Sequence, residues 1–511
     1  MLACVHSAAL RGVEATLVRV EVDVATGLPQ FATVGLPDSA VRESRERVRS
    51  AIRNAGFKFP DDRITVNLAP ADVRKEGAAF DLPIALGILE ATGFVKNCLG
   101  PFAVVGELAL DGQIQAVPGT LAVALTCRRR GPRTLLVPRD NAAEAAAVGG
   151  LRVVPVATLR DAVALLNGEM EPEPPPPPLV TLDRPDGSEL ADVRGQAHAK
   201  RALEIAAAGG HNLLLVGPPG AGKTMLARCL AGILPPLEGD EVIEVSTIWS
   251  VAGLLPRRGG LTDRRPFRTP HHTISLSGLI GGGSPLRPGE VTLAHRGVLF
   301  MDELPEYQQH VLEALRQPIE DGRVSLARAR GVSSFPARFQ LVAAANPCRR
   351  GCPSLDECVC TPGERQRYLG RISRPLLDRI DLHVELPALS PDAWEHGVLG
   401  EPSAAVAARV AAARAFARER FQGQRISVNA EMSARQLHRL CPASPEVERL
   451  LAAAVARLGL SARGHDRVLR VARTIADLAG AEHVGVEHCA EAIQYRGLDR
   501  AWRADVTVPA G

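Results

Sequence analysis

The chain has 511 residues, of which 46% are hydrophobic and 23% are charged, and its formal net charge is +3. This length is sufficient for about three or four domains, and the composition is typical of a soluble globular protein. The small net charge excludes nucleic-acid binding through bulk charge, so any such contact depends on local basic patches. The first residues lack the pattern of a signal peptide, and no uncharged apolar run is long enough to span a bilayer. We therefore expect a cytoplasmic protein with reduced cysteines.

Residues before about 170 mix strand and helix patterns, which predicts an α/β domain. The stretch ATLVRVEVDV alternates apolar and polar residues, as a half-buried strand does. The stretch SAVRESRERVRSAIRNAG predicts an amphipathic helix with Val41, Val48 and Ile52 facing inward and its arginines in solvent. Further strands are predicted at ITVNLAP, FAVVGEL and TLLVP.

The proline-rich stretch EPEPPPPPLV, Glu171 to Val180, is the clearest boundary in the chain. Polyproline forms a semi-rigid extended spacer and does not lie inside a packed domain. It predicts a linker between the amino-terminal part and the remainder of the chain.

A phosphate-binding loop comes directly after the apolar run LLLV, Leu213 to Val216. Its glycines allow a tight turn whose backbone N–H groups surround phosphate oxygens, and the next segment has helical spacing. Lys223 is expected to reach the β- and γ-phosphates of ATP, and the Thr224 hydroxyl to bind Mg²⁺. The loop consists of Gly217, Pro218, Pro219, Gly220, Ala221, Gly222, Lys223 and Thr224.

Two further apolar runs end in the polar groups that hydrolysis requires. GVLFMDE ends in Asp302 and Glu303, and FQLVAAAN ends in Asn346. We expect Asp302 to hold Mg²⁺ through water, Glu303 to polarise the attacking water, and the Asn346 amide to sense the γ-phosphate.

Four cysteines lie within thirteen residues directly after Asn346. Four thiolates match a closed tetrahedral zinc site, and a metal would order a turn-rich loop that has little core of its own. The C-x-C pair is tighter than the usual spacing, so a loop with four reduced cysteines is the alternative. The cysteines are Cys348, Cys352, Cys358 and Cys360.

Arginines downstream are candidates for contacting phosphate. Arg379 in PLLDRID has the position of an arginine finger, and its alternative is a surface arginine paired with Asp378 or Asp381. From about residue 390 the chain has regular helical spacing and predicts a helical lid. There Arg463 or Arg467 is a second phosphate-sensing candidate, and we prefer Arg463.

Several motifs together resemble the YifB/ComM family of magnesium-chelatase-like AAA+ proteins. They are DVRGQAHAKRALEIAAAGGHNLLLVGPPGAGKT, FRTPHHTIS, GVLFMDELPEY, AAANP, SRPLLDRIDL and SARGHDRVLRVARTIADL. The resemblance covers almost the whole chain and implies a hexameric ring ATPase that drives branch migration or unwinding of DNA in recombination and transformation. It implies a Lon-protease-like domain at 1–170, a linker at 171–180, an AAA+ core with a parallel sheet at 181–390 and a helical lid at 391–511.

The sequence departs from the implied patterns in two places. KEGAAFDL has Ala78, Ala79 and Phe80 where a Lon-type protease has its serine, and no lysine lies in VPGTLAVAL. Because a Ser–Lys dyad needs both members, we expect no protease activity. Arg350 stands where the family usually has the second cysteine of its CPC motif.

Two basic segments are candidates for contacting DNA. Residues 251–296 are rich in arginine with few acids, and GRVSLARARGVSSFPARF predicts a β-hairpin. Both resemble loops that line the pore in this clade, and basic loops bind phosphates without reading sequence. Arginines that bridge subunits are the alternative. The candidates are Arg287, Arg328 and Arg330.

Three functions fit these motifs to different degrees. An ATP-driven DNA motor is favoured by the amino-terminal domain, the linker and the cysteine loop. A chelatase-type ATPase that remodels a metal-inserting partner would use the same core motifs. A non-enzymatic scaffold is disfavoured by the intact Asp302, Glu303 and Arg379.

Overall fold

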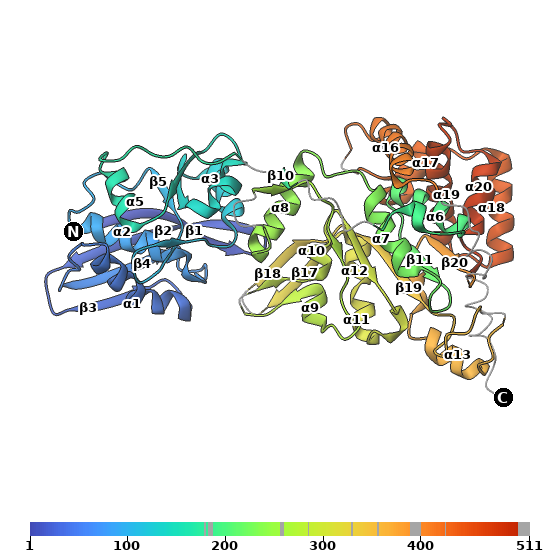
Figure 1. Cartoon of the computed structure of the whole chain (residues 1–511), viewed down its shortest axis with the longest axis horizontal. Coiled ribbons are helices and arrows are strands. Elements are labelled where there is room, and N and C mark those ends of the chain that lie inside the picture. Colours follow the sequence, from blue (N-terminus) through green and yellow to red (C-terminus); the bar gives the residue numbers. More distant parts are fainter. Residues whose placement is uncertain are drawn as a thin grey trace.

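The computed structural model describes residues 1–177, 180–181, 188–255, 260–284, 286–328, 331–354, 357–388, 400–424 and 426–498. An amino-terminal sheet lies at one end of an elongated molecule, a second sheet lies in the middle, and carboxy-terminal helices lie at the other end (Figure 1). Arg330 and the side chain of Arg328 lie outside the described part of the chain.

The amino-terminal unit is a mixed seven-stranded sheet of order β3-β4-β2-β1-β5-β8-β9. An antiparallel β1–β2 pair joins a parallel β5-β8-β9 edge. The strands are β1 (Leu2–Arg11), β2 (Glu14–Ala25), β3 (Gln30–Val34), β4 (Arg63–Ala69), β5 (Phe102–Val104), β8 (Thr134–Pro138) and β9 (Arg152–Val156), with a small β6 (Glu107–Leu108) and β7 (Ile114–Gln115) pair. The helices are α1 (Ser39–Asn54), α2 (Asp81–Ala91), α3 (Thr120–Arg130), α4 (Ala142–Ala146) and α5 (Leu159–Leu166).

Helix α1 confirms the predicted amphipathic helix and corrects one detail of it. The Asp38 side chain caps its start by accepting from the Val41 N–H, and Val41, Val48 and Ile52 are buried. The predicted solvent face is interrupted by Arg47, which donates to both carboxylate oxygens of Asp81 at 2.6 and 3.0 Å. Burial raises the pKa of the Asp81 carboxyl to about 6, although the bond from Arg47 opposes the shift. Arg47 therefore pairs with the buried Asp81 carboxylate on α2 instead of lying in solvent with the other arginines of α1.

The middle unit contains a five-stranded parallel sheet of order β13-β16-β19-β11-β20. Its central strands are buried along their whole length, as the apolar runs predict. The strands are β11 (Leu213–Val216), β13 (Phe267–Arg268), β16 (Val298–Met301), β19 (Gln340–Ala345) and β20 (Leu382–Glu385). The helices are α6 (Ala197–Gly209), α7 (Lys223–Ile233), α8 (Asp240–Ala252), α9 (Leu276–Ile280), α10 (Glu290–Leu293), α11 (Gln309–Ala314), α12 (Arg316–Asp321), α13 (Pro362–Leu369) and α14 (Arg374–Leu377).

Three two-stranded pairs extend from this middle unit. The predicted hairpin before β19 is present as an antiparallel pair. The pairs are β10 (Val180–Thr181) with β12 (Leu261–Thr262), β14 (Gly281–Gly282) with β15 (Arg287–Pro288), and β17 (Arg323–Arg328) with β18 (Gly331–Pro336).

The carboxy-terminal region is helical, as its apolar spacing predicts. Its helices share one hydrophobic core with α6, α7 and the central strands. They are α16 (Ser403–Arg420), α17 (Ala434–Leu440), α18 (Pro445–Leu458), α19 (Ala462–Leu478) and α20 (Val486–Gln494).

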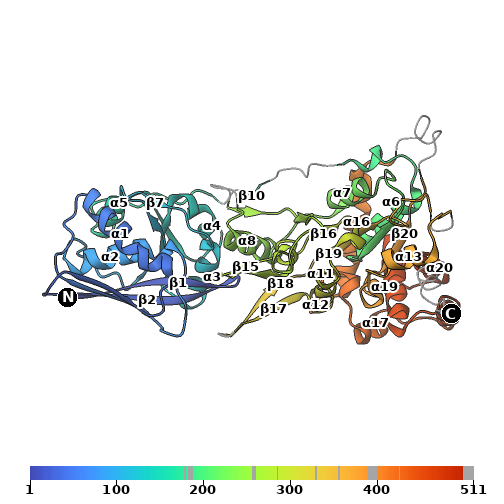
Figure 2. The same cartoon turned by 90° about the horizontal axis from the view of Figure 1, so that it is seen from below.

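The amino-terminal unit packs directly on helix α8 of the middle unit, and both views place α3 beside α8 (Figures 1 and 2). The backbone N–H of Gly119 donates to the Ser250 carbonyl at 2.9 Å. Leu261 belongs to the hydrophobic cluster of the amino-terminal unit, and Val242 and Ile243 of α8 pack against that cluster. The two units therefore touch, although the proline-rich stretch in the sequence predicts a spacer between separated parts.

Candidate functional site

The phosphate-binding loop joins β11 to α7 at the carboxyl end of the parallel sheet. Gly220 and Gly222 have φ values of +80° and +85°, in a region that favours glycine, so the loop turns sharply before α7 begins at Lys223. The loop amides and the amino terminus of α7 form an arrangement that suits phosphate oxygens. The predicted strand, loop and helix are therefore all present.

Lys223 is nearly buried in this loop and donates three hydrogen bonds. Its Nζ atom lies 2.7 Å from the Gly217 carbonyl, 2.8 Å from the Pro218 carbonyl and 2.9 Å from Oδ1 of Asn346. Burial lowers the pKa of the Lys223 ammonium, while the charges of Asp302 and Glu303 act in the opposite direction. An ammonium group held by neutral oxygens and two nearby carboxylates is positioned to exchange carbonyl contacts for phosphate contacts.

Candidate magnesium ligands meet beside the loop. Oγ1 of Thr224 donates to Oδ2 of Asp302 at 2.8 Å, and the Glu303 N–H donates to Oδ1 of Asp302 at 2.9 Å. A hydroxyl and a carboxylate are the hard oxygen ligands that Mg²⁺ takes together with nucleotide phosphates. The donor set therefore fits a magnesium ion, which Thr224 and Asp302 would hold.

Topology brings these groups together. Strand β19 pairs with β16 on one side and with β11 on the other, in parallel. The carboxyl ends of the three strands meet at one edge, so Asp302, Asn346 and the phosphate-binding loop become neighbours. The sequence predicts this set because each apolar run ends in the appropriate polar group.

Sequence reasoning missed a histidine beside Glu303. Nδ1 of His272 lies 3.6 Å from Oε2 of Glu303, and the His272 ring contacts the edge of Tyr307. Tyr307 is fixed in turn by its hydroxyl, which donates to the Pro270 carbonyl at 2.6 Å. The sequence signal that could have identified His272 is the stretch FRTPHHTIS, which sequence reasoning assigns to a basic segment that contacts DNA. His272 is therefore a candidate for orienting Glu303.

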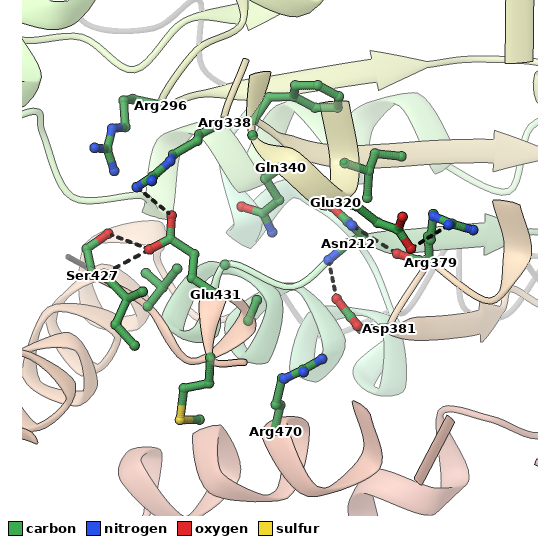
Figure 3. Close-up of a pocket in the computed structure, with 18 of the residues that line it drawn as sticks. Asn212, Arg296, Glu320, Arg338, Gln340, Arg379, Asp381, Ser427, Glu431 and Arg470 are labelled. Atoms are coloured by element: carbon green, nitrogen blue, oxygen red, sulfur yellow. Dashed lines mark hydrogen bonds and ion pairs between the residues drawn. The ribbon is translucent and has the colours of Figure 1, made fainter. Parts of the chain in front are cut away.

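The two candidate phosphate-contacting arginines, Arg379 and Arg463, lie near the amino ends of the parallel strands, whereas the phosphate-binding loop lies at their carboxyl ends. Arg379 is almost fully buried and its Nη2 donates to Glu320, while Nη1 of Arg463 lies 3.5 Å from Oε1 of the same carboxylate. The partner of Arg379 is thus Glu320 rather than Asp378 or Asp381. Both arginines line a cavity of about 520 Å³ between the sheet and the carboxy-terminal helices, with Asn212, Gln340 and Asp381 at the amino ends of its strands (Figure 3).

Arg467, the alternative to Arg463, has a structural environment. Its Nε atom lies 3.6 Å from Oδ1 of Asp381, and its side chain is 11% exposed, whereas that of Arg463 is 68% exposed. Burial alone would raise the pKa of the Asp381 carboxyl, but the His211 ring 3.6 Å away, the Arg467 charge and the hydrogen bond from the Asn212 N–H hold it below its usual value. An exposed guanidinium can reach a second molecule directly, so the geometry favours Arg463 over Arg467. Arg379, whose side chain is 5% exposed, would first have to leave Glu320.

The basic segments divide into paired and exposed arginines. Four of the arginines form salt bridges within the chain: Arg265 with Glu241, Arg268 with Glu290, Arg296 with Glu244, and Arg338 with Glu431. Arg287 in β15 and Arg323 at the start of β17 are exposed. Of the remaining candidates, Arg330 and the side chain of Arg328 lie outside the described part of the chain.

The four cysteines after Asn346 converge on one point. Their Sγ atoms all lie within 4.8 Å of one another, with Cys348, Cys352 and Cys360 buried and Cys358 half-buried. All four are free thiols. This cluster has the ligands and the proximity to bind a metal ion.

A parallel sheet with a glycine-rich phosphate loop, acids on the neighbouring strand and a helical region behind it fits an ATPase fold of the AAA+ type. The chain matches three family profiles: "Magnesium chelatase, subunit ChlI" at residues 189–394, "Subunit ChlI of Mg-chelatase" at 20–141 and "Magnesium chelatase, subunit ChlI C-terminal" at 400–496.

Relatives extend the match to the whole chain. It is 44% identical over 508 residues to "Uncharacterized protein YifB" of Salmonella typhimurium and over 507 residues to "Competence protein ComM" of Haemophilus influenzae, covering 98% of each chain in both cases. It is 28% identical over 171 residues to "Magnesium-chelatase 38 kDa subunit" of Rhodobacter capsulatus, which covers 30% of this chain and 48% of the relative. The chain belongs to the YifB/ComM family of magnesium-chelatase-like proteins. In the part of the chain that the structure describes, no helix has the length and apolarity needed to cross a membrane.

Proposed function

We propose that the protein is a ring-forming, cytoplasmic ATP hydrolase that couples hydrolysis to movement along DNA, in branch migration or unwinding of recombination intermediates. The observation that carries this proposal is the extent of the match. The relative named as a competence protein aligns over 98% of both chains, whereas the chelatase subunit aligns over 30% of this chain. The match to the competence protein therefore extends well beyond the part of the chain that aligns with the chelatase subunit.

The proposed hydrolysis uses the polar groups at the strand ends. The loop amides and Lys223 bind the phosphates of ATP, and Thr224 and Asp302 hold Mg²⁺, which neutralises charge on the phosphates. Glu303 polarises the attacking water and Asn346 orients the γ-phosphate. His272, 3.6 Å from Glu303, fixes the direction of that carboxylate.

Assembly into a homo-hexamer would complete this site. Arg379 and Arg463 lie at the edge of the sheet opposite their own phosphate-binding loop, next to Glu320. Groups so placed cannot contact a nucleotide in their own chain without a large rearrangement, but in a head-to-tail ring they face a neighbour. We infer that both act in trans, Arg379 as the finger and Arg463 as the lid sensor.

The domain organisation follows the same proposal. We assign residues 1–170 to a Lon-protease-like domain, 171–180 to a linker, 181–390 to the AAA+ core and 391–511 to the lid. The first domain is non-proteolytic because alanine and phenylalanine occupy positions 78–80. Its contact with α8, through Gly119 and Ser250, supports an architectural role.

DNA contact is assigned to the β17–β18 hairpin and the glycine-rich turn after α9. Changing Arg328 and Arg330 together to alanine should weaken DNA binding. It should also flatten the plot of log binding constant against log salt concentration, whose slope should fall in magnitude by about 0.7–0.9 for each phosphate that is no longer neutralised. ATP binding and assembly should survive, because neither residue belongs to the ATP site. Binding titrations at several salt concentrations measure both quantities.

The control for that experiment removes the same charge elsewhere. Arg42 and Arg45 are exposed on α1, in the amino-terminal unit. Changing both to alanine should leave affinity and salt slope unchanged. Equal effects of the two double variants would assign the binding to net charge rather than to the hairpin.

We further propose that Zn²⁺ occupies the four-cysteine cluster, since four convergent thiols fit a closed tetrahedral structural site. Metal analysis of protein purified without added zinc should find about one zinc ion per chain. If folded, reduced and active protein contains no zinc, the zinc site is contradicted and the alternative, a loop with four reduced cysteines, stands.

A second candidate function is remodelling of a partner that inserts Mg²⁺ into a porphyrin. The three chelatase family profiles favour it. The two functions differ in what stimulates hydrolysis: DNA in the first case, and porphyrin together with a chelatase partner in the second.

A further inference from the structure

The segment that carries the four cysteines has almost no core apart from their sulfur atoms. It runs from Asn346, after β19, to Thr361, before α13. No helix or strand forms in its described residues, 346–354 and 357–361. Among the described residues, the hydrophobic cluster here consists of the four cysteine side chains alone. Such a segment does not bury enough apolar surface to hold one conformation, so something else must fix it.

The sulfur atoms are arranged for a single ion. A tetrahedral zinc site with bonds of about 2.3 Å places its sulfur atoms roughly 3.8 Å apart. The observed separations, all within 4.8 Å, need little movement to reach that value. The Cys352 N–H also lies 3.4 Å from Sγ of Cys348, and a backbone donor of this kind stabilises a metal-bound thiolate.

The cysteine segment touches the nucleotide-binding groups at two points. Asn346 at its start accepts from Nζ of Lys223 at 2.9 Å. Farther along, Gly351 lies against Pro219 of the phosphate-binding loop, because a Cβ atom on Gly351 would lie 2.9 Å from Cδ and Cγ of Pro219. The turn between Cys348 and Cys352 therefore touches the phosphate-binding loop at Pro219, which otherwise stays exposed.

The far end of the segment is anchored as well. Thr361 caps α13 in a reciprocal pair with Glu364, and Arg350 lies 3.3 Å from the same carboxylate. Closing the four sulfur atoms around one ion would therefore tie Asn346, Gly351 and α13 into one rigid support.

We propose that zinc at this cluster supports the phosphate-binding loop, so that the affinity of the protein for ATP depends on zinc. The proposal rests on the zinc site proposed above and gives that site a function. Zinc binding supplies the free energy that orders the segment. The ordered segment holds the Asn346 amide and the Pro219 turn in the arrangement that receives phosphate. Zinc loss should weaken ATP binding even though no cysteine contacts the nucleotide.

The test measures zinc content and ATP affinity on the same full-length protein. Zinc is removed with a chelator under reducing conditions, the chelator is removed, and the dissociation constant for ATP is measured in excess Mg²⁺. We expect about one zinc ion per chain at the start. We expect at least about tenfold weaker binding after removal, which is the loss of about 1.4 kcal/mol. Adding back one equivalent of Zn²⁺, but not further Mg²⁺, should restore affinity.

A variant separates the contact from the metal. Gly351 has φ +71°, and Gly351→Ala adds a Cβ atom against Pro219 in a conformation that strains alanine. This variant should retain zinc but bind ATP more weakly. The matched control is Cys98→Ser, an exposed cysteine in the amino-terminal unit, which should change neither quantity.

The outcomes separate the two proposals. Absence of zinc from folded protein overturns the zinc site. If zinc is present but its removal leaves ATP affinity unchanged, the zinc site stands and its role in supporting the loop is overturned. Unchanged ATP affinity in zinc-loaded Gly351→Ala overturns the contact with Pro219 as the route.

Discussion

Replacing Arg379 by alanine is expected to leave ATP binding intact and to reduce hydrolysis by about 10³–10⁵-fold, as expected for loss of an arginine finger. Arg379 lies at the amino ends of the strands, away from its own phosphate-binding loop, so in the proposed ring its charge would act on the nucleotide of a neighbour. The variant should still fold, because the Glu320 carboxylate left behind is 43% exposed and remains hydrated, but it should be less stable, because the buried Arg379 side chain leaves a cavity. Steady-state ATPase rates beside equilibrium ATP binding measure the two effects.

Mixing experiments test the action in trans. Rings that combine Arg379→Ala with Lys223→Ala chains should recover part of the activity, since each supplies the group that the other lacks. Arg435→Ala, an exposed arginine on α17, is the matched control and should hydrolyse ATP normally. Absence of rescue in verified mixed rings would contradict action across an interface.

Replacing Lys223 by alanine is expected to abolish nucleotide binding at ordinary ATP concentrations. The ammonium is the charged group inside the loop, within 2.9 Å of Asn346 and of two loop carbonyls. Loss of one partner of a buried charged pair costs about 2–5 kcal/mol, or roughly 30- to 4,000-fold in affinity. Binding of a fluorescent ATP analogue gives the affinity. Lys58→Ala, an exposed lysine in the amino-terminal unit, serves as the control.

Replacing Glu303 by glutamine should separate binding from hydrolysis. Glutamine has the size of glutamate but is a poor base, so ATP affinity should be retained while turnover falls by about 10²–10⁴-fold. Hydrolysis at the rate of the unmodified protein would show that Glu303 is not the group that activates the attacking water. His272→Ala should have a smaller effect in the same direction, because His272 acts only through Glu303.

The groups at the strand ends could be predicted because a local pattern determines them. Apolar runs such as Leu213–Val216 are long enough only for buried strands, and parallel pairing aligns their ends. Asp302, Asn346 and Lys223 therefore meet without any long-range information beyond the order of strands. The same reasoning predicts the amphipathic helix α1 and its buried Val41 and Val48.

Contacts between distant elements could not be predicted in this way. The Asp81 carboxylate that draws Arg47 out of solvent lies on another helix, 34 residues away. Glu320 becomes the common partner of Arg379 and Arg463 only when α12, α14 and α19 converge. Periodicity carries no information about such convergence, because it depends on how elements pack in three dimensions.

The packing of the amino-terminal unit on α8 could not be predicted either. The pattern of Val242 and Ile243 is that of ordinary core residues of the helix that carries them, yet they pack against the cluster of the amino-terminal unit. Polyproline predicts a chain boundary but carries no information about whether the flanking units touch. The contact through Ser250 comes from residues with no distinctive pattern.

The most direct test of the proposed motor is the ATPase rate of the full-length protein with a Holliday junction, single-stranded DNA, duplex DNA or porphyrin, with junction migration followed in parallel. We expect branched or single-stranded DNA to stimulate hydrolysis and the junction to migrate only when ATP is hydrolysed. Stimulation by porphyrin and a chelatase partner alone, with no movement of any junction, would contradict the DNA motor and favour the chelatase-type function.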